Sequence, residues 1–216
     1  KQNNALGIQE VIEKAFSGLG INNPEIFASG RTDAGVHAFE QCFNTKINFN
    51  KIDKLPIALN SKLPEDIRIL WAKEVDANFH ARFSAHKKTY VYRIKIDNIE
   101  SPFDSFYTTY LCYKLDYYKM KEASKLLLGE HNFQAFCSSH TTTPDYIRTI
   151  YFINIKKTDN LYEFEICGNG FLYNMVRIIV GTLVDIGRNK ISIEQLKKIL
   201  TSNNRQEAGK TMPAKG

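Results

Sequence analysis

One loop of this chain combines a carboxylate, a cation and turn-forming residues. It spans Gly30 to His37 and places Asp33 between Arg31 and Gly35. The stretches 25–29 and 38–45 on either side are predicted to be short strands. A loop between strands holds a carboxylate in place, and catalytic residues often occupy such loops. Asp-x-Gly is also common turn chemistry, so the loop taken alone leaves open a purely structural role for Asp33.

A second charged residue, Arg177, lies within an apolar stretch. Residues 172–186 are hydrophobic nearly all round and are predicted to form a buried helix. An unpaired charge would be expensive there, and a carboxylate partner would relieve the cost. An arginine that extends along the helix surface to reach water is the alternative. The apolar neighbours of Arg177 favour burial.

Aromatic and basic residues alternate in a third segment. Phe79, His80, Ala81, Arg82 and Phe83 are followed by two lysines. This composition is typical of a surface that contacts RNA. Just beyond it, residues 89–96 alternate in the manner of a half-buried strand that begins near Tyr90.

The composition limits the class of protein. The 216 residues carry 29 lysines and arginines against 23 acids, a net charge of +6 that favours a polyanionic partner. The four cysteines form no C-x-x-C pair and indicate reduced, mostly buried thiols. The five histidines lack metal-ligand spacing, so we expect no metal site, and we expect structural roles for His131 and His140. We find no run of about 18 apolar residues and no leader, and we expect a cytoplasmic protein with no membrane contact.

The periodicity predicts an α+β fold. Two α/β halves, 1–84 and 85–216, are expected to contain mixed, largely antiparallel sheets packed on helices. The first half carries the Asp33 loop, and the second carries Tyr90 and Arg177. Helices are predicted at 11–19, 51–60, 116–129, 172–186 and 192–200, and strands at 25–29, 38–45, 67–71, 89–96, 106–113, 147–155 and 161–167.

Five blocks of the chain, in order, resemble the tRNA pseudouridine synthase A family. They are 30–38, 81–85 with 90–94, 129–136, 168–181 and 211–216. The sequence departs from the family at Asn132, where aspartate is usual, and at Asn174, where histidine is commoner. The family pattern starts before Lys1 and continues past Gly216, so the resemblance implies a core piece of a longer protein.

The resemblance implies the pseudouridine synthase fold and an activity. The family isomerises uridine to pseudouridine at positions 38, 39 and 40 in the anticodon stem-loop of tRNA. By the same resemblance Asp33 is the essential catalytic carboxylate, Tyr90 stacks on the target base and Arg177 is the partner of Asp33. Whether Asp33 attacks carbon or takes a proton from the sugar stays open. The reaction is an isomerisation and requires no cofactor and no metal.

The residues also indicate how RNA would be held. Arg31, next to the Asp33 turn, can fill the space left by an extruded uridine and bind phosphate, and a surface ion pair is the alternative for it. The composition of Phe79, His80, Ala81, Arg82 and Phe83 predicts contact with RNA, and the resemblance implies a homodimer. Three alternatives remain open: a non-catalytic RNA-binding protein, a pseudouridine synthase with a different RNA target, and a hydrolase that uses Asp33 as a general base. The hydrolase ranks last because no second acid or metal site is recognisable.

Overall fold

The computed structural model describes residues 6–139 and 145–216 and divides the chain into two compact units. The first unit is Lys1–Arg31 with Ala38–Ala85, and the second is Thr32–His37 with His86–Gly216. The short segment that contains Asp33 therefore packs with the second unit, although its neighbours in sequence belong to the first. The domain division at 84/85 stays a prediction. His140 lies outside the described residues.

The first unit packs two helices against a two-stranded sheet. Helix α1 (Ile8–Ser17) follows the extended residue Gly7, and α2 (Leu55–Asn60) continues from the 3-10 turn η1 (Ile52–Lys54). Strands β1 (Ile26–Ala28) and β2 (Phe43–Thr45) pair antiparallel. Phe16 and Leu59 are almost fully buried in the core that joins these elements. The amphipathic pattern of α1 thus produces the expected buried face.

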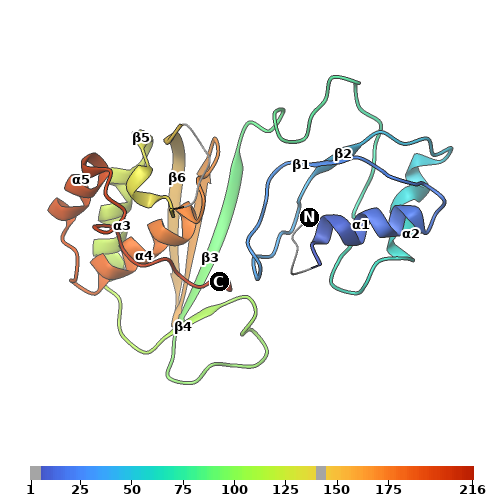
Figure 1. Ribbon diagram of the computed structural model, residues 1–216. Helices are drawn as coiled ribbons and strands as arrows, with labels where there is room; N and C mark the ends of the chain where they lie inside the picture. Colours follow the sequence, from blue (N-terminus) through green and yellow to red (C-terminus); the bar gives the residue numbers. More distant parts are fainter. Residues whose placement is uncertain (1–5, 140–144) are drawn as a thin grey trace. The chain divides into compact units, whose positions relative to one another are not determined.

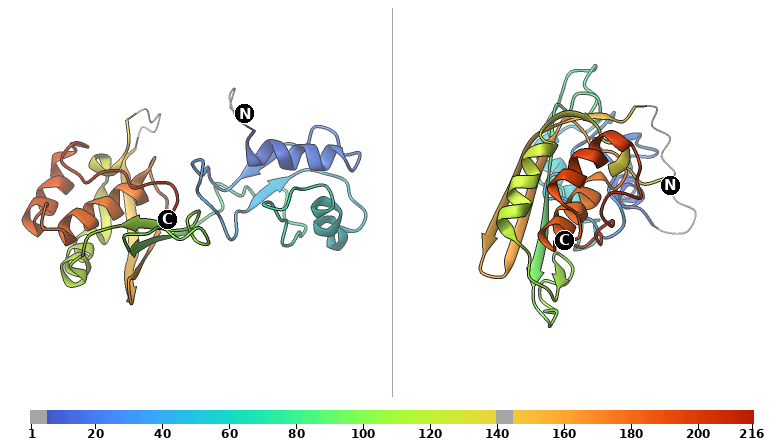
Figure 2. Two further views of the ribbon diagram at one scale, coloured as in Figure 1. Left: turned by 90° about the horizontal axis from the view of Figure 1, so that it is seen from below. Right: turned by 90° about the vertical axis from the view of Figure 1, so that its left-hand side faces the viewer.

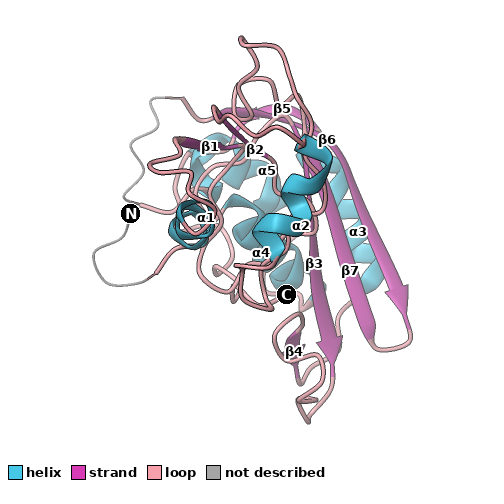
Figure 3. Cartoon of the chain, turned by 90° about the vertical axis from the view of Figure 1, so that its right-hand side faces the viewer, coloured by secondary structure: helices cyan, strands magenta, loops and turns pink. Residues whose placement is uncertain are grey.

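The second unit is built on a five-stranded sheet with the order β4-β3-β7-β6-β5. Its three long strands, β3 (Lys88–Ile96), β7 (Leu161–Gly168) and β6 (Ile147–Thr158), lie side by side in Figure 3. The shorter strands are β4 (Thr109–Leu111), which runs parallel to β3, and β5 (Gly129–Asn132), antiparallel to β6. All other pairings are antiparallel, so the sheet is mixed, as predicted.

Three helices cover one face of this sheet (Figures 1 and 2). They are α3 (Tyr117–Ser124), α4 (Met175–Gly187) and α5 (Ile193–Ser202), with 3-10 turns η2 (Lys125–Leu127) and η3 (Gln134–Phe136). Asp116 caps α3, and the predicted capping box of Ser192 and Gln195 starts α5. Helix α4 is buried nearly all round, which explains why its sequence shows no polar stripe.

The alternation in β3 decides which side chains reach the interior. Tyr92 and Ile94 are buried beneath the helices, while Val91 is 38% exposed on the opposite face. Tyr90, at the beginning of the strand, is half-buried and packs against the edge of the core. The strand therefore delivers Tyr90 to the end of the sheet where β3 begins.

Several predicted elements differ from the structure. Residues 67–71 form no strand: the Asn60 side chain bonds both the N–H and the C=O of Ile69, and Leu70 and Trp71 are exposed. Strands β2 and β4 are shorter than predicted. The sequence predicts no strand at β5, because its four residues are one glycine and three polar residues with no alternation of apolar side chains. The α+β class itself is confirmed.

The cysteines and the helix lengths complete the comparison. Cys137 and Cys167 are buried, but Cys42 is half-buried and Cys112 is exposed, so the prediction of mostly buried thiols holds for two of them. Within the described residues, the structure contains no helix long and apolar enough to cross a membrane.

Candidate active site

Asp33 opens a tight turn whose geometry depends on a glycine. The Val36 N–H donates to the Asp33 carbonyl at 3.1 Å, and Gly35 has φ +84°. A positive φ at the third position is typical of a type II turn and favours glycine. A Cβ on Gly35 would also lie 3.4 Å from the Ala214 side chain. The turn therefore fixes the direction in which the Asp33 carboxylate leaves the backbone.

Arg177 is the ion-pair partner of Asp33, as the sequence predicts. Arg177 Nη1 lies 2.9 Å from Asp33 Oδ2, although the two residues are 144 positions apart. The side chain of Arg177 is 21% exposed and that of Asp33 is 33% exposed. Arg177 is thus partly rather than fully buried. The Asp33 side chain stays partly open to solvent.

Two further acceptors hold the Arg177 guanidinium. Nε donates to the Met212 carbonyl at 2.6 Å, and Nη1 donates to Asn174 Oδ1 at 2.8 Å. The Met212 N–H returns a hydrogen bond of 3.2 Å to the Arg177 carbonyl. A guanidinium presents its donors in one rigid plane, so these contacts fix its orientation as well as its position.

The charge of Asp33 acts on the phenol of Tyr90. Burial raises the pKa of the Tyr90 phenol, and the nearby Asp33 carboxylate raises it further. The Tyr90 ring meets the edge of Phe171, with ring centroids 5.3 Å apart and planes at 87°. The structure therefore brings Asp33, Arg177 and Tyr90 together from a loop, a helix and a strand.

A C-terminal strap, residues 208–216, closes over α4 and supplies the Met212 carbonyl. It approaches the helix so closely that a Cβ on Gly181 would overlap Lys210 and one on Gly209 would overlap Thr182. Arg205 donates to the carbonyls of Ala208 and Gly209 and so fixes the start of the strap. The absence of side chains at these glycines allows the strap to pack close to α4, and the strap in turn reaches the aspartate turn at Ala214.

The Tyr92 hydroxyl anchors the end of the strap. It lies 2.6 Å from Thr109 Oγ1 and donates to the Pro213 carbonyl at 2.8 Å. Burial raises the pKa of Tyr92 to about 12, while the hydrogen bond with Thr109 and the charge of Arg177 act in the opposite direction. The hydroxyl therefore keeps its proton at neutral pH and remains available as a donor to the strap.

Removing that hydroxyl should destabilise the protein. We expect Tyr92→Phe to lower the free energy of unfolding by about 1–2 kcal/mol, because the strap carbonyl loses a buried donor. Urea denaturation followed by circular dichroism measures this change. Tyr117→Phe is the control, since the Tyr117 hydroxyl donates to Ile155, away from the strap. Equal stability of Tyr92→Phe and the native protein would contradict an anchoring role.

The segment 79–83 forms a compact aromatic turn in the first unit. The His80 ring packs between Phe27 and Phe83, with centroids 5.0 and 4.4 Å away. Ala81 is buried, and its N–H donates to Asn44 Oδ1 at 2.8 Å, so Ala81 holds the turn in place. Arg82 and Phe83 are exposed, with the Arg82 guanidinium 5.8 Å from the Phe83 ring.

The remaining predicted RNA-binding residues differ in exposure. Arg31 is exposed and immediately precedes the turn segment, whereas Phe79 is half-buried in the first unit. His37 packs its ring against Tyr107, with centroids 4.5 Å apart, which supports the aspartate turn from its far end.

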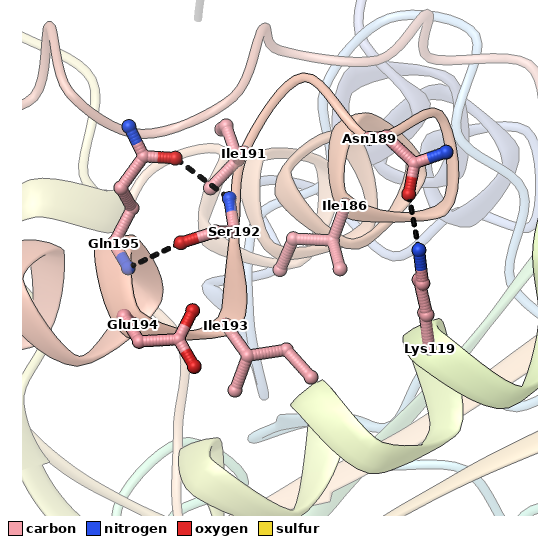
Figure 4. A pocket seen from close by; sticks show the side chains of 8 residues that line it. All are labelled: Lys119, Ile186, Asn189, Ile191, Ser192, Ile193, Glu194 and Gln195. Atoms are coloured by element: carbon pink, nitrogen blue, oxygen red, sulfur yellow. Dashed lines mark hydrogen bonds between the residues drawn. The ribbon is translucent and has the colours of Figure 1, made fainter.

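A pocket of about 300 Å³ lies elsewhere in the second unit (Figure 4). Lys119 of α3 reaches across it to Asn189, and the reciprocal bonds of Ser192 and Gln195 form its opposite wall. Lys119 and Asn189 bond each other, Ser192 and Gln195 form the capping box of α5, and the pocket includes none of the predicted site residues. Among the residues that the structure describes, no cluster of histidine, cysteine or carboxylate side chains could hold a metal ion.

Sequence reasoning missed three contributors to the site: the Met212 carbonyl, the Tyr92 hydroxyl and the Asn174 side chain. The first is a backbone atom and leaves no residue-type signal. Tyr92 has the alternation of an ordinary core residue, so only its long-range bond to the strap separates it from the core. Asn174 stood out only as a departure from the family pattern, although asparagine next to an apolar helix is a signal for a left-handed residue.

Several known proteins that are similar to this chain carry one name, and a family model matches most of its length. A family model described as tRNA pseudouridine synthase matches residues 1–84 and 123–216, which include Asp33 and Arg177. The chain is 43% identical to tRNA pseudouridine synthase A of Thermoanaerobacter sp. (strain X514), over 100% of this chain and 88% of that protein. It is 45% identical to the protein of the same name from Bacillus pumilus (strain SAFR-032), over 88% and 78%. The protein of that name from Bacillus subtilis (strain 168) is 41% identical over 97% and 86%.

Proposed function

Since this chain belongs to the tRNA pseudouridine synthase family, we propose that it isomerises uridines 38, 39 and 40 in the anticodon stem-loop of tRNA, with Asp33 as the essential carboxylate. The family assignment carries the coarser part of this statement: the protein is an isomerase that converts uridine to pseudouridine in tRNA. The uridine positions and the roles of individual residues are the proposal.

The observation that carries the proposal is the placement of Asp33. Its carboxylate is held by Arg177 at 2.9 Å, its side chain remains one-third exposed, and its charge helps to raise the pKa of the Tyr90 phenol. A carboxylate in a purely structural turn needs neither a guanidinium from a helix far along the chain nor an aromatic neighbour. A group that must act on a bound nucleoside needs both orientation and access.

The chemistry fits a carboxylate beside an aromatic ring. The C1′–N1 bond of uridine breaks, the uracil turns, and a C5–C1′ bond forms. C5 loses its proton and N1 gains one, so the atoms balance without a co-reactant. Asp33 would act at the junction of sugar and base, while the Tyr90 ring would stack on the uracil. Stacking of a base on an aromatic side chain contributes about 1–3 kcal/mol and tolerates rotation of the base.

The RNA contacts of the proposal lie in the first unit. Arg31 would occupy the space of the extruded uridine and contact phosphate. Arg82 and Phe83 would meet the RNA directly, with Phe79, His80 and Ala81 holding their turn in place. The net charge of +6 supports a polyanionic substrate. We also propose that the protein acts as a homodimer in the cytoplasm.

Two other functions would use the same surfaces. A non-catalytic RNA-binding protein would also be basic and carry exposed aromatics, but it would not need a carboxylate among its phosphate contacts. A synthase with a different RNA target would share the whole site, because these residues read the chemistry and not the RNA. Mapping the modified positions separates all three.

The test is to map pseudouridine in unmodified tRNA after incubation with the protein. Carbodiimide labelling followed by primer extension locates each modified uridine. We expect stops at 38, 39 and 40 in those tRNAs that carry uridine there. Stops confined to another arm would replace the substrate assignment, and no stops on any tRNA would favour the RNA-binding alternative.

Arg82→Ala should weaken tRNA binding through loss of one phosphate contact. We expect reduced affinity at every site and a plot of log affinity against log salt whose slope is shallower by about one. Filter binding at a series of salt concentrations measures both. Lys197→Ala, an exposed position on α5, is the control and should leave the slope unchanged. If Arg82→Ala showed the same slope as the native protein, Arg82 would make no phosphate contact and would not belong to the RNA-binding surface.

A further inference from the structure

Asn174 directs its side chain toward the guanidinium of Arg177 and not toward the backbone N–H groups of the first turn of α4. It is the N-cap residue of α4, where an asparagine would usually accept a bond from the first helical turn, yet it makes no such capping bond. Its Oδ1 instead accepts from Arg177 Nη1 at 2.8 Å, and its Nδ2 donates to Ser138 Oγ at 2.9 Å. Both ends of the amide are therefore used.

The backbone at Asn174 is left-handed, with φ +61° and ψ +8°. This conformation costs about 1–2 kcal/mol in most residues but is well tolerated by asparagine. A backbone hydrogen bond joins the same segment to the loop after η3: the Ser138 N–H donates to the Tyr173 carbonyl at 3.1 Å. Ser138, Tyr173 and Asn174 are thus joined by two hydrogen bonds, and we call these three residues the Asn174 frame.

The Asn174 frame is connected to Asp33 through a single atom, Arg177 Nη1. Arg177 Nη1 donates both to Asn174 Oδ1 and to Asp33 Oδ2, so a single NH₂ group lies between the amide and the carboxylate. The other anchor of the guanidinium, the Met212 carbonyl, binds Nε. Met212 can fix where the guanidinium lies, but rotation about the Cζ–Nη1 bond is limited by the two Nη1 acceptors.

We propose that Asn174 is a positioning residue that holds Arg177 Nη1 in the orientation in which it presents a proton to Asp33. The inference rests on the proposed function for its effect on turnover, but the positioning itself is a property of the free protein. The side-chain hydrogen bonds of Asn174 go to Ser138 and Arg177 and not to the Asp33 carboxylate. It acts through Arg177, and its loss should lower the rate of the chemical step and not the affinity for tRNA.

Asn174→Gly isolates the amide, because glycine adopts a positive φ without strain. Asn203→Gly is the matched control: Asn203 ends α5 with φ +55° and is exposed. We expect Asn174→Gly to lower kcat about 10-fold or more, with KM and tRNA Kd within 3-fold of native values, while Asn203→Gly retains native kcat. Asn174→His should recover at least half of the lost activity at pH 8. Histidine tolerates the left-handed region, and neutral imidazole offers one acceptor nitrogen.

A second readout needs no RNA. In arginine-detected nuclear magnetic resonance of the free protein, we expect rotation about the Arg177 Cζ–Nη1 bond to be at least 3-fold faster in Asn174→Gly than in the native protein or Asn203→Gly. Unchanged rotation, native kcat in Asn174→Gly, or a lost kcat that Asn174→His does not recover would each overturn the inference. If the native protein forms no pseudouridine, the proposed function fails, and the rotation rate alone still decides whether Asn174 holds Arg177.

Discussion

Asp33→Asn should abolish pseudouridine formation while leaving tRNA affinity within a few-fold of the native value. The substitution removes the negative charge and replaces one carboxylate oxygen by an NH₂ group, with almost no change in size. Asparagine fits the same turn, and its amide oxygen can still accept from Arg177 Nη1, so the surrounding contacts remain. In the proposed function, the carboxylate that is lost acts at the sugar–base junction and not on phosphates. Nucleoside analysis of the reacted tRNA measures turnover, and filter binding measures affinity.

Asp159→Asn is the control for this experiment. Asp159 lies in the turn between β6 and β7, is exposed and has φ +53°, a conformation that asparagine also tolerates. It should retain native activity and native affinity. If Asp33→Asn lost tRNA binding in the same proportion as activity, the carboxylate would be part of the binding surface and the catalytic role would be wrong.

Arg177→Met should lower kcat about 100-fold or more. The variant keeps an unbranched apolar side chain within α4 but removes the donors to Asp33, Asn174 and Met212 at once. Without these donors the Asp33 carboxylate can move out of its productive geometry, and a misplacement of about 1 Å can lower the rate of a reaction about 100-fold. The kcat of Arg177→Lys should lie between those of the native protein and Arg177→Met, because a single ammonium cannot donate to all three acceptors in the geometry of the guanidinium plane. Single-turnover assays with saturating protein measure the chemical step directly.

Arg188→Met separates catalysis from stability. Arg188 lies at the other end of α4, its guanidinium 3.7 Å from the Tyr113 ring centroid, and its side chain is 26% exposed, similar to that of Arg177. Both variants should lower the thermal midpoint, but only Arg177→Met should lower kcat. Equal losses of activity in the two would show that α4 stability, and not the contact with Asp33, limits turnover.

The Asp33–Arg177 pair could be predicted because each residue carries its own physical signal. An arginine among apolar neighbours needs a carboxylate partner, but its sequence environment does not say which one. The resemblance to the family identifies Asp33 as that partner. The structure places the two charges within hydrogen-bond distance, with Arg177 somewhat more exposed than the apolar sequence suggested.

The missed contacts are those that the chain makes with its own backbone or through residues of ordinary type. The Met212 carbonyl has no side-chain signature, and the close approach of the strap to Gly181 depends on a glycine in the middle of a helix. Likewise, residues 67–71 have strand composition, but the Asn60 amide satisfies the backbone of Ile69 without a partner strand. Local pattern fixes neither of these, because both depend on partners distant in sequence or in another element.

Release of the C5 hydrogen is the most direct test of the claim that this protein isomerises uridine. The substrate is unmodified tRNA that carries tritium at C5 of its uridines, and the two products measured are tritium in water and free uracil. Isomerisation predicts tritium release in step with pseudouridine formation and no free uracil. No release would contradict isomerisation and favour RNA binding alone, and free uracil would show that the glycosidic bond is hydrolysed instead.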